Sequence, residues 1–113
     1  MREIKFRAWD KQNKRLVTVS LIDLKYEGIL FEVENGSNSR KFDEVELMQF
    51  TGLKDKKGVE IYEGDIFQKG ELKGIIEWKQ YGWGYTLIKP MFHMQFTMED
   101  VEIIGNIYEN HEL

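Results

Sequence analysis

Three acidic side chains lie close together in the sequence and could form a catalytic carboxylate pair. They are Glu60, Glu63 and Asp65. Acid–base catalysis by two carboxylates requires a pocket in which their pKa values are pushed apart. These residues instead flank Gly64, where Asp65 can accept hydrogen bonds from backbone N–H groups. We therefore expect Gly64 and Asp65 to be structural turn residues, and we favour this interpretation over the catalytic one.

The chain offers few residues for a metal centre, a thiol reaction or a phosphate-binding loop. It has no cysteine, and its two histidines, His93 and His111, have no second ligand at a zinc-site spacing. The glycine-containing segment 69–74 lacks the Lys-Ser/Thr ending and the following helix of a phosphate loop, so we predict a hairpin turn there. We therefore expect no metal, no cofactor and no enzymatic activity.

The strongest candidate for a binding surface is a set of aromatic and lysine side chains in the second half of the chain. Small β-barrels that bind single-stranded nucleic acid combine stacking aromatics with Lys or Arg. The same aromatics could instead be core residues or anchors of a subunit interface, which we favour because this half is acidic. The members of this aromatic–lysine surface are Lys69, Lys73, Trp78, Lys79, Tyr81, Trp83 and Tyr85.

Charge and composition narrow the class of protein further. The net charge of −4 comes from residues 50–113, which carry seven basic and eleven acidic groups, whereas residues 1–49 carry nine of each. An acidic balance argues against broad nucleic-acid binding. The 113 residues contain 42% apolar side chains, enough for a core, but no apolar run near the ~20 residues of a membrane span. The first residues do not resemble a signal peptide, so we expect a cytoplasmic protein with no membrane partner.

Turn signals divide the chain into short apolar runs, which predicts a β-rich fold. Residues 4–9 alternate between apolar and polar types and precede a polar turn, in which Asn13 is placed to be left-handed. In the central stretch, Asp55 can accept backbone hydrogen bonds at the start of a turn, and Gly58 can supply the positive φ at its end. Turns every eight to twelve residues are typical of a small antiparallel barrel or roll.

Three stretches of the sequence carry a shared pattern: Ile4–Asp10, Leu47–Asp55 continuing through Gly58 and Glu60–Ile66, and Ile104–Asn110. They resemble the YopX-like family of phage and prophage proteins. The resemblance implies a mainly β protein with an SH3-like barrel, and from the pattern of the first residues we expect an N-terminal β-hairpin extension. It also implies a phage or prophage origin, action in the bacterial cytoplasm and self-association, but no particular activity. The usual proline after the Glu-Asn pair is replaced by His111.

These observations predict one YopX-like domain over residues 1–113, with a candidate subdivision into an N-terminal β segment, 1–49, and an SH3-like barrel, 50–113. Two hypotheses for function stay open. The favoured one is a non-enzymatic, homo-oligomeric binding module that engages an unknown host or phage protein. The alternative is a nucleic-acid-binding barrel that uses the aromatic–lysine surface.

Overall fold

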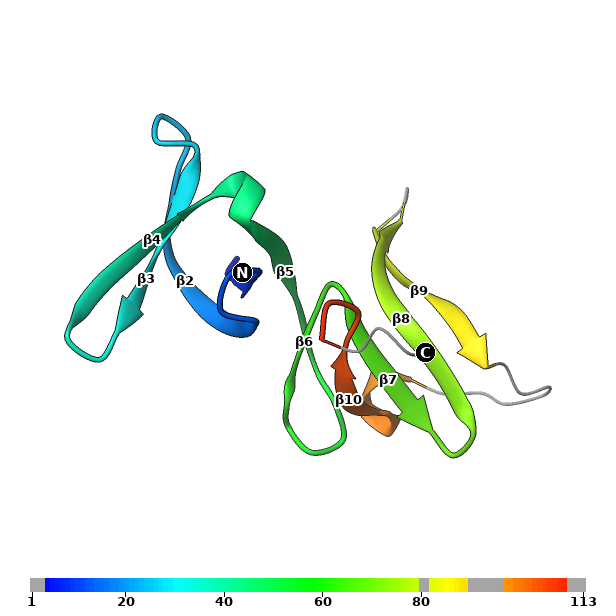
Figure 1. The fold of residues 1–113 in the computed structure, drawn as a ribbon. Coiled ribbons are helices and arrows are strands. Elements are labelled where there is room, and N and C mark those ends of the chain that lie inside the picture. The colour runs from blue at the N-terminus through cyan, green and yellow to red at the C-terminus, as the bar shows by residue number, and fades with distance from the viewer. Residues whose placement is uncertain (1–3, 80–81, 90–96, 110–113) are drawn as a thin grey trace. The chain divides into compact units, whose positions relative to one another are not determined.

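The protein is built from short β-strands, and the mainly β prediction is confirmed. The structure, a computed structural model, describes residues 4–79, 82–89 and 97–109. Within these residues every regular element is a strand or a single 3-10 turn (Figure 1). The chain separates into two compact units, one formed by Ile4–Gln49 and the other by residues from Phe50 onward. They are named the N-terminal unit and the C-terminal unit.

The N-terminal unit is an antiparallel sheet in the order β4-β3-β2-β1-β5. Its meander continues the predicted first hairpin, since Ala8 lies opposite Val17 in the register of β1 and β2. These two side chains belong to the core of the unit, together with Ile29, Phe31 and Val45. The elements are β1 (Phe6–Asp10), β2 (Arg15–Asp23), β3 (Gly28–Val33), β4 (Gly36–Lys41), a 3-10 turn (Phe42–Glu44) and the first half of β5 (Val45–Lys54).

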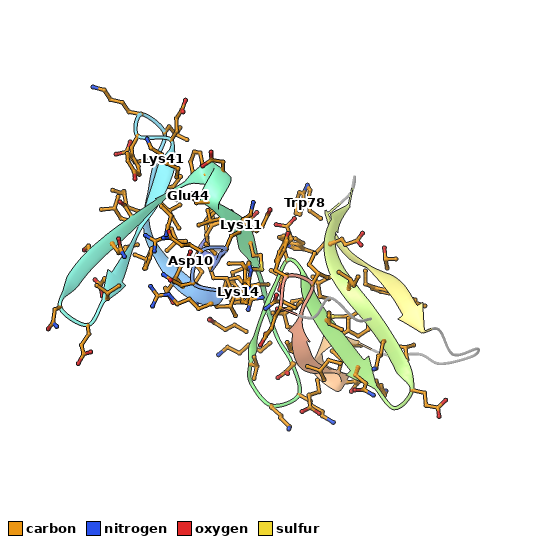
Figure 2. All side chains as sticks on the ribbon, in the orientation of Figure 1. Asp10, Lys11, Lys14, Lys41, Glu44 and Trp78 are labelled. Atoms are coloured by element: carbon orange, nitrogen blue, oxygen red, sulfur yellow. The ribbon has the colours of Figure 1, made fainter. Side chains whose placement is uncertain are left out.

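A buried carboxylate organises the first turn of the N-terminal unit. Asp10 lies at the end of β1 (Figure 2). It is fully buried and accepts hydrogen bonds from the backbone N–H of Gln12 at 3.1 Å and from Arg40 Nε at 3.3 Å. Burial alone would raise the pKa of Asp10, but the N–H donors of Asn13 and Gln12 and the charge of Arg40 hold this pKa below its ordinary value. The left-handed residue of the turn is Lys14, with φ of 51°, and the prediction for Asn13 was wrong by one position.

The C-terminal unit contains an antiparallel sheet in the order β10-β7-β8-β9, and β6 pairs with the second half of β5 (Figure 1). Its core is formed by Ile61, Phe67, Leu72, Ile76 and Val101. The segment predicted as a hairpin turn does join β7 and β8, with Lys69 opposite Leu72. The elements are β6 (Glu60–Tyr62), β7 (Asp65–Lys69), β8 (Leu72–Lys79), β9 (Gly82–Lys89), a 3-10 turn η2 (Met98–Asp100) and β10 (Glu102–Asn106).

The strands of the C-terminal unit form a small antiparallel β fold, as expected, but they do not close into a barrel. A closed barrel needs its first and last strands to pair with each other. Among the described strands, β10 and β9 instead remain at opposite edges of the four-stranded sheet. The expected N-terminal hairpin extension is likewise a larger element, because three further strands, β3, β4 and β5, complete its sheet.

The outer edge of β10 is occupied by the turn that follows β5. Asp55 is buried, with 5% of the residue exposed, and its Oδ2 accepts the backbone N–H of Ile103 at 2.9 Å. Its Oδ1 accepts the N–H groups of Lys57 at 2.8 Å and Val59 at 2.9 Å. Burial would raise the pKa of Asp55, but these three donors hold this pKa below its ordinary value. The Asp55 turn therefore engages the backbone N–H of Ile103, which would otherwise be exposed at the edge of the sheet.

Candidate binding pocket

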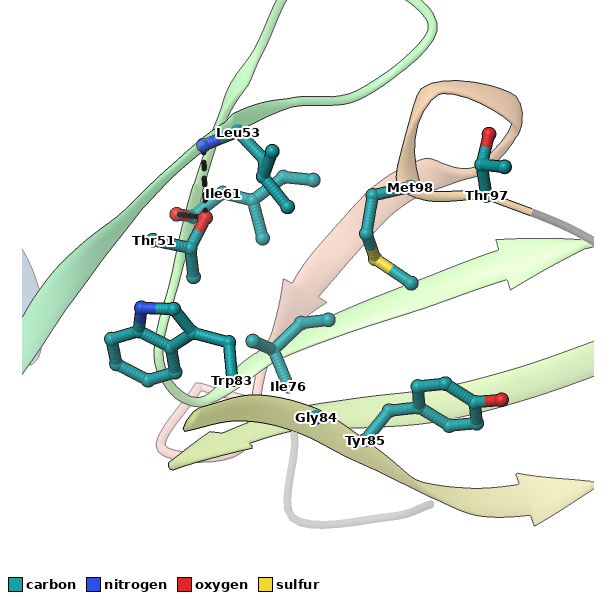
Figure 3. A pocket seen from close by; sticks show the side chains of 9 residues that line it. All are labelled: Thr51, Leu53, Ile61, Ile76, Trp83, Gly84, Tyr85, Thr97 and Met98. Carbon is teal, nitrogen blue, oxygen red and sulfur yellow. Dashed lines mark hydrogen bonds between the residues drawn. The ribbon is translucent and has the colours of Figure 1, made fainter. Parts of the chain in front are cut away.

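The C-terminal unit carries a pocket of about 250 Å³ on one face of strands β8 and β9 (Figure 3). Most of its wall is apolar. Ligand pockets of proteins have this character, with a few polar groups that fix orientation. The lining residues are Thr51, Leu53, Ile61, Ile76, Trp83, Gly84, Tyr85, Thr97 and Met98.

The alternation of side chains along β8 and β9 determines which aromatic residues line the pocket. Successive side chains of a strand point to opposite faces, and residues directly opposite each other share a face. Tyr85 of β9 lies opposite Ile76 of β8, and Trp83 lies opposite Trp78. These four side chains therefore share the face that carries the core residue Ile76. The ring of Tyr85 is held edge-on against the core ring of Phe67, with centroids 5.7 Å apart.

The facing wall is fixed by hydrogen bonds of Thr51. Its hydroxyl donates to the carbonyl oxygen of Ile61 at 2.8 Å and accepts the backbone N–H of Leu53 at 3.1 Å (Figure 3). Gly52 between them has a positive φ of 89°, where the pairing of β5 with β6 shifts register. At this bulge the exposed side chain of Leu53 lines the pocket, so the wall presents an apolar surface there.

Trp83 brings the main polar group to the pocket. Its indole reaches from β9 towards the side of Thr51 (Figure 3), and no acceptor for the indole N–H is found among the described residues. The ring is half-buried and packs edge-on against Trp78, with centroids 4.7 Å apart and an interplanar angle of 79°. Trp78 itself is 56% exposed at the end of β8 (Figure 2). The pocket thus ends at an aromatic pair in which Trp83 is half-buried and Trp78 is exposed.

The lining contains few groups that could take part in acid–base chemistry. Among the lining residues the phenol of Tyr85 is the single titratable group. Thr51 already donates its hydroxyl proton to Ile61, and the hydroxyl of Thr97 donates to Asp100 at 3.2 Å. A nucleophilic hydroxyl requires a neighbouring base. The base nearest to a lining hydroxyl is the carboxylate of Asp100, which lies outside the lining, is 51% exposed and is 3.8 Å from Lys69. The arrangement can hold an apolar group and present it with one N–H donor.

The structure brings together only part of the predicted aromatic–lysine surface. Trp78, Trp83 and Tyr85 share one face, as the register shows. Lys73 lies on the opposite face of β8, because an odd number of positions separates it from Trp78. Lys69, at the end of β7, lies 3.8 Å from the carboxylate of Asp100. Tyr81 and the side chain of Lys79 lie outside the described residues.

Two of the three candidate carboxylates have contacts within the β5–β7 region. Asp65 is buried and accepts the backbone N–H of Tyr62 at 2.8 Å, across the turn that contains Gly64. Glu60 lies opposite Lys54 in the pairing of β6 with β5. Within the described ranges, no group of three or more acidic or histidine side chains could hold a metal ion. His93 and His111 lie outside these ranges.

Sequence reasoning missed the wall that faces the aromatics. Thr51, Leu53 and Ile61 lie in stretches that the sequence marks only by their family resemblance, and nothing in their spacing indicates a pocket. Met98 lies in the isolated turn η2, where no periodic pattern exists to indicate which way its side chain points. The one available signal was the alternation of Trp83 and Tyr85 along a strand, which predicts a shared face.

Comparisons with known proteins complete the description of the chain. A sequence model described as "YopX protein" matches residues 5–113. The crystal structure of protein EF1440 from Enterococcus faecalis is similar to this chain, with 27% sequence identity and a TM-score of 0.65, and the match covers 99% of this chain and 98% of that one. No curated protein gives a match. In the described part of the chain, no helix has the length and apolar character needed to cross a membrane.

Proposed function

The chain belongs to the YopX protein family, and we propose that it is a non-enzymatic binding module that holds a protein partner through the pocket of its C-terminal unit. The observation that carries this proposal is an apolar pocket whose wall lacks an acid–base pair, while its rim is aromatic. Aromatic side chains beside a pocket are typical anchors of protein–protein interfaces.

The volume of the pocket supports a side chain as its occupant. A cavity of ~150 Å³ is large enough for benzene, whereas pockets for small-molecule ligands typically have ~300–1,000 Å³. The pocket of about 250 Å³ falls between these sizes. One large apolar or aromatic side chain, inserted from a partner, would fill it and shield Leu53, which is 44% exposed.

The cellular setting is also part of the proposal. The module would be encoded by a phage or prophage and would act in the bacterial cytoplasm on a host or phage protein. The family resemblance supports this setting, and the similar Enterococcus faecalis protein comes from a bacterium.

The proposed module also self-associates, and the N-terminal unit offers a surface for it. Leu21 is 52% exposed and Leu24 is 79% exposed, at the end of β2 and in the turn that follows. Large exposed aliphatic side chains are common at interfaces between copies. Light scattering should give a mass above that of one chain, and Leu24→Ser should lower it. A monomer at all concentrations would refute self-association.

A second candidate function rests on the exposed ring of Trp78. Single-stranded nucleic acid stacks its bases on such rings, and the affinity then falls steeply with salt. The position of Lys73 on the opposite face of β8 makes this candidate the weaker one, because the backbone of a bound strand needs cations on the same side. Undetectable binding of oligonucleotides at low ionic strength would reject it.

A crosslinked pull-down from bacteria that express the tagged protein tests the main proposal. The pocket variant is Leu53→Asp, which places a charge in the apolar wall. The matched control is Val59→Asp, because Val59 is a similarly exposed apolar residue, at 47%, outside the lining. We expect a protein captured by the wild type and the control but lost with Leu53→Asp. Equal capture by all three forms would refute the role of the pocket, and co-purified nucleic acid would support the second candidate.

A further inference from the structure

We propose that the partner presents a proline-rich segment in the polyproline II conformation. One proline ring of the segment would fill the pocket, a backbone carbonyl next to it would accept the indole N–H of Trp83, and a Lys or Arg would lie against the acidic turn η2. This inference rests on the proposed function and specifies the chemistry of the partner.

The first argument is that the pocket offers a hydrogen-bond donor, whereas acceptors in its wall are already engaged. The hydroxyl of Thr51 accepts the N–H of Leu53, and the backbone carbonyl of Thr97 accepts the N–H of Asp100 at 2.9 Å. The indole N–H of Trp83 has no acceptor among the described residues. A ligand that brings carbonyl groups but few N–H groups therefore suits this wall. Proline has no backbone N–H, so it leaves no unsatisfied donor in an apolar pocket.

The second argument is the group of aromatic rings beside the pocket. Trp78, Trp83 and Tyr85 share one face of β8 and β9, and Trp78 and Tyr85 are 56% and 43% exposed. Grooves lined by aromatic rings bind polyproline II segments, whose backbone has no internal hydrogen bonds and loses little entropy on binding. A cavity of about 150 Å³ accommodates benzene. The pocket of about 250 Å³ therefore has room for the smaller ring of a proline.

The third argument concerns charge and composition, which favour a foreign partner over a second copy of this chain. Residues 50–113 carry the whole net charge of −4. Glu99 and Asp100 are exposed in η2, directly after the lining residue Met98. Two copies meeting here would bring like charges together, whereas a Lys or Arg of the segment would complement them. The sequence contains one proline, Pro90, so a segment with several prolines has to come from another protein.

Selection from a displayed library of random peptides tests the proline requirement. We expect enriched peptides to share two prolines separated by two residues, with a Lys or Arg beside them. For one enriched peptide, replacing the anchoring proline with alanine introduces a backbone N–H and should weaken binding by about tenfold. N-methylalanine at the same position has no N–H, and it should restore most of the lost affinity.

The donor and the acidic turn are tested in the protein with the same peptide. Trp83→Phe keeps an aromatic ring but removes the indole N–H, and it should weaken binding by about five- to tenfold. The matched control is Trp78→Phe, which makes the same change outside the lining and should have a smaller effect. Bound peptide should shift the indole N–H signal that is absent from Trp83→Phe. Glu99→Lys should weaken binding several-fold, whereas Glu71→Lys, in the exposed turn between β7 and β8, should not.

Three outcomes would overturn the inference: a selection that enriches no proline, equal binding of the proline and alanine peptides, or equal effects of Trp83→Phe and Trp78→Phe. The peptide series needs only the wild-type protein, so it decides the matter even if a variant folds poorly. If proline peptides fail while a cellular protein is still lost with Leu53→Asp, the polyproline segment is wrong and the proposed function stands. If neither experiment shows dependence on Leu53, the proposed function fails as well.

Discussion

Replacing Asp55 with asparagine is expected to destabilise the C-terminal unit by about 3 kcal/mol. The carboxylate accepts two N–H groups of its own turn at Oδ1 and the N–H of Ile103 at Oδ2. An asparagine can keep the first two bonds through its carbonyl oxygen. Its NH₂ group then faces the N–H of Ile103, so that two buried donors meet without an acceptor. The opposite amide orientation would lose both turn bonds and keep only the long-range one.

The magnitude follows from the bond that is lost. A hydrogen bond to a charged acceptor contributes about 1.5–3 kcal/mol, and a buried unsatisfied donor costs about 1–3 kcal/mol. Their combined effect of about 3 kcal/mol corresponds to a fall in Tm of roughly 12–24 °C for a unit of this size. Urea denaturation followed by tryptophan fluorescence, together with hydrogen exchange at the Ile103 amide, would measure it.

The control for this experiment is Asp23→Asn. Asp23 Oδ1 accepts two turn N–H groups, from Lys25 and Tyr26, each at 3.0 Å. The described contacts of Asp23 include no long-range partner that resembles Ile103. Asparagine can keep both turn bonds, so the free energy of unfolding should change by less than about 1 kcal/mol. Equal destabilisation by the two substitutions would refute the reasoning.

The pH dependence provides an independent check. The pKa of Asp55 is lowered in the folded protein, by the backbone donors that outweigh its burial. Its contribution is therefore fully present above the unfolded pKa of about 3.9 and is lost as the pH falls through the lowered folded value. The difference in stability between the wild type and Asp55→Asn should shrink across that acidic range. A difference that stays constant to the lowest pH would contradict the assigned role of the charge.

Three further perturbations test other parts of the structure. Gly74→Ala should lower the free energy of unfolding by about 1–3 kcal/mol, because the added Cβ would lie 2.4 Å from Phe67 Cζ. In the double variant, Phe67→Leu should remove much of this destabilisation. If the effects of the two substitutions on the free energy of unfolding were simply additive, this explanation would be wrong. Asp10→Asn should destabilise the N-terminal unit by about 3 kcal/mol, since it leaves Arg40 without its buried partner. That loss should disappear as the pH falls through the lowered pKa of Asp10, and a pH-independent loss in urea melts would count against it. Lys57→Gln should leave the urea midpoint unchanged in low and high salt, because its ion pair is exposed.

Much of the fold can be predicted from the sequence where the determining interactions are local. The turn chemistry of Asp55 and Gly58 acts within five residues, so residue types alone indicate it. The bond from Ile103 to Asp55 joins residues 48 positions apart, and no local pattern contains that information. The turn after β1 illustrates a smaller failure. Asp10 accepts the N–H and the side-chain amide of Asn13, so the left-handed residue is Lys14 instead.

The candidate site was less predictable because it depends on register. The aromatic–lysine surface was chosen by residue type and therefore included both Lys73 and Trp78. The alternation of side chains along a strand places these two residues on opposite faces. The pairing of Trp78 with Trp83 needs the β8–β9 register. The opposite wall of the pocket needs the tertiary placement of η2, which carries Met98. A sequence without an alignment provides neither the register nor this placement.

The turn around Asp55 also guards against polymerisation of the folded chain. Residues 101–108, Val-Glu-Ile-Ile-Gly-Asn-Ile-Tyr, are rich in β-branched residues, carry one charge and lack proline. Such a segment could template cross-β fibrils if its edge were free. The hydrogen bond from Ile103 to Asp55 removes one of the edge donors that a second molecule would need. Variants that loosen this turn should therefore precipitate during expression, and their yield of soluble protein should fall faster than their thermal stability.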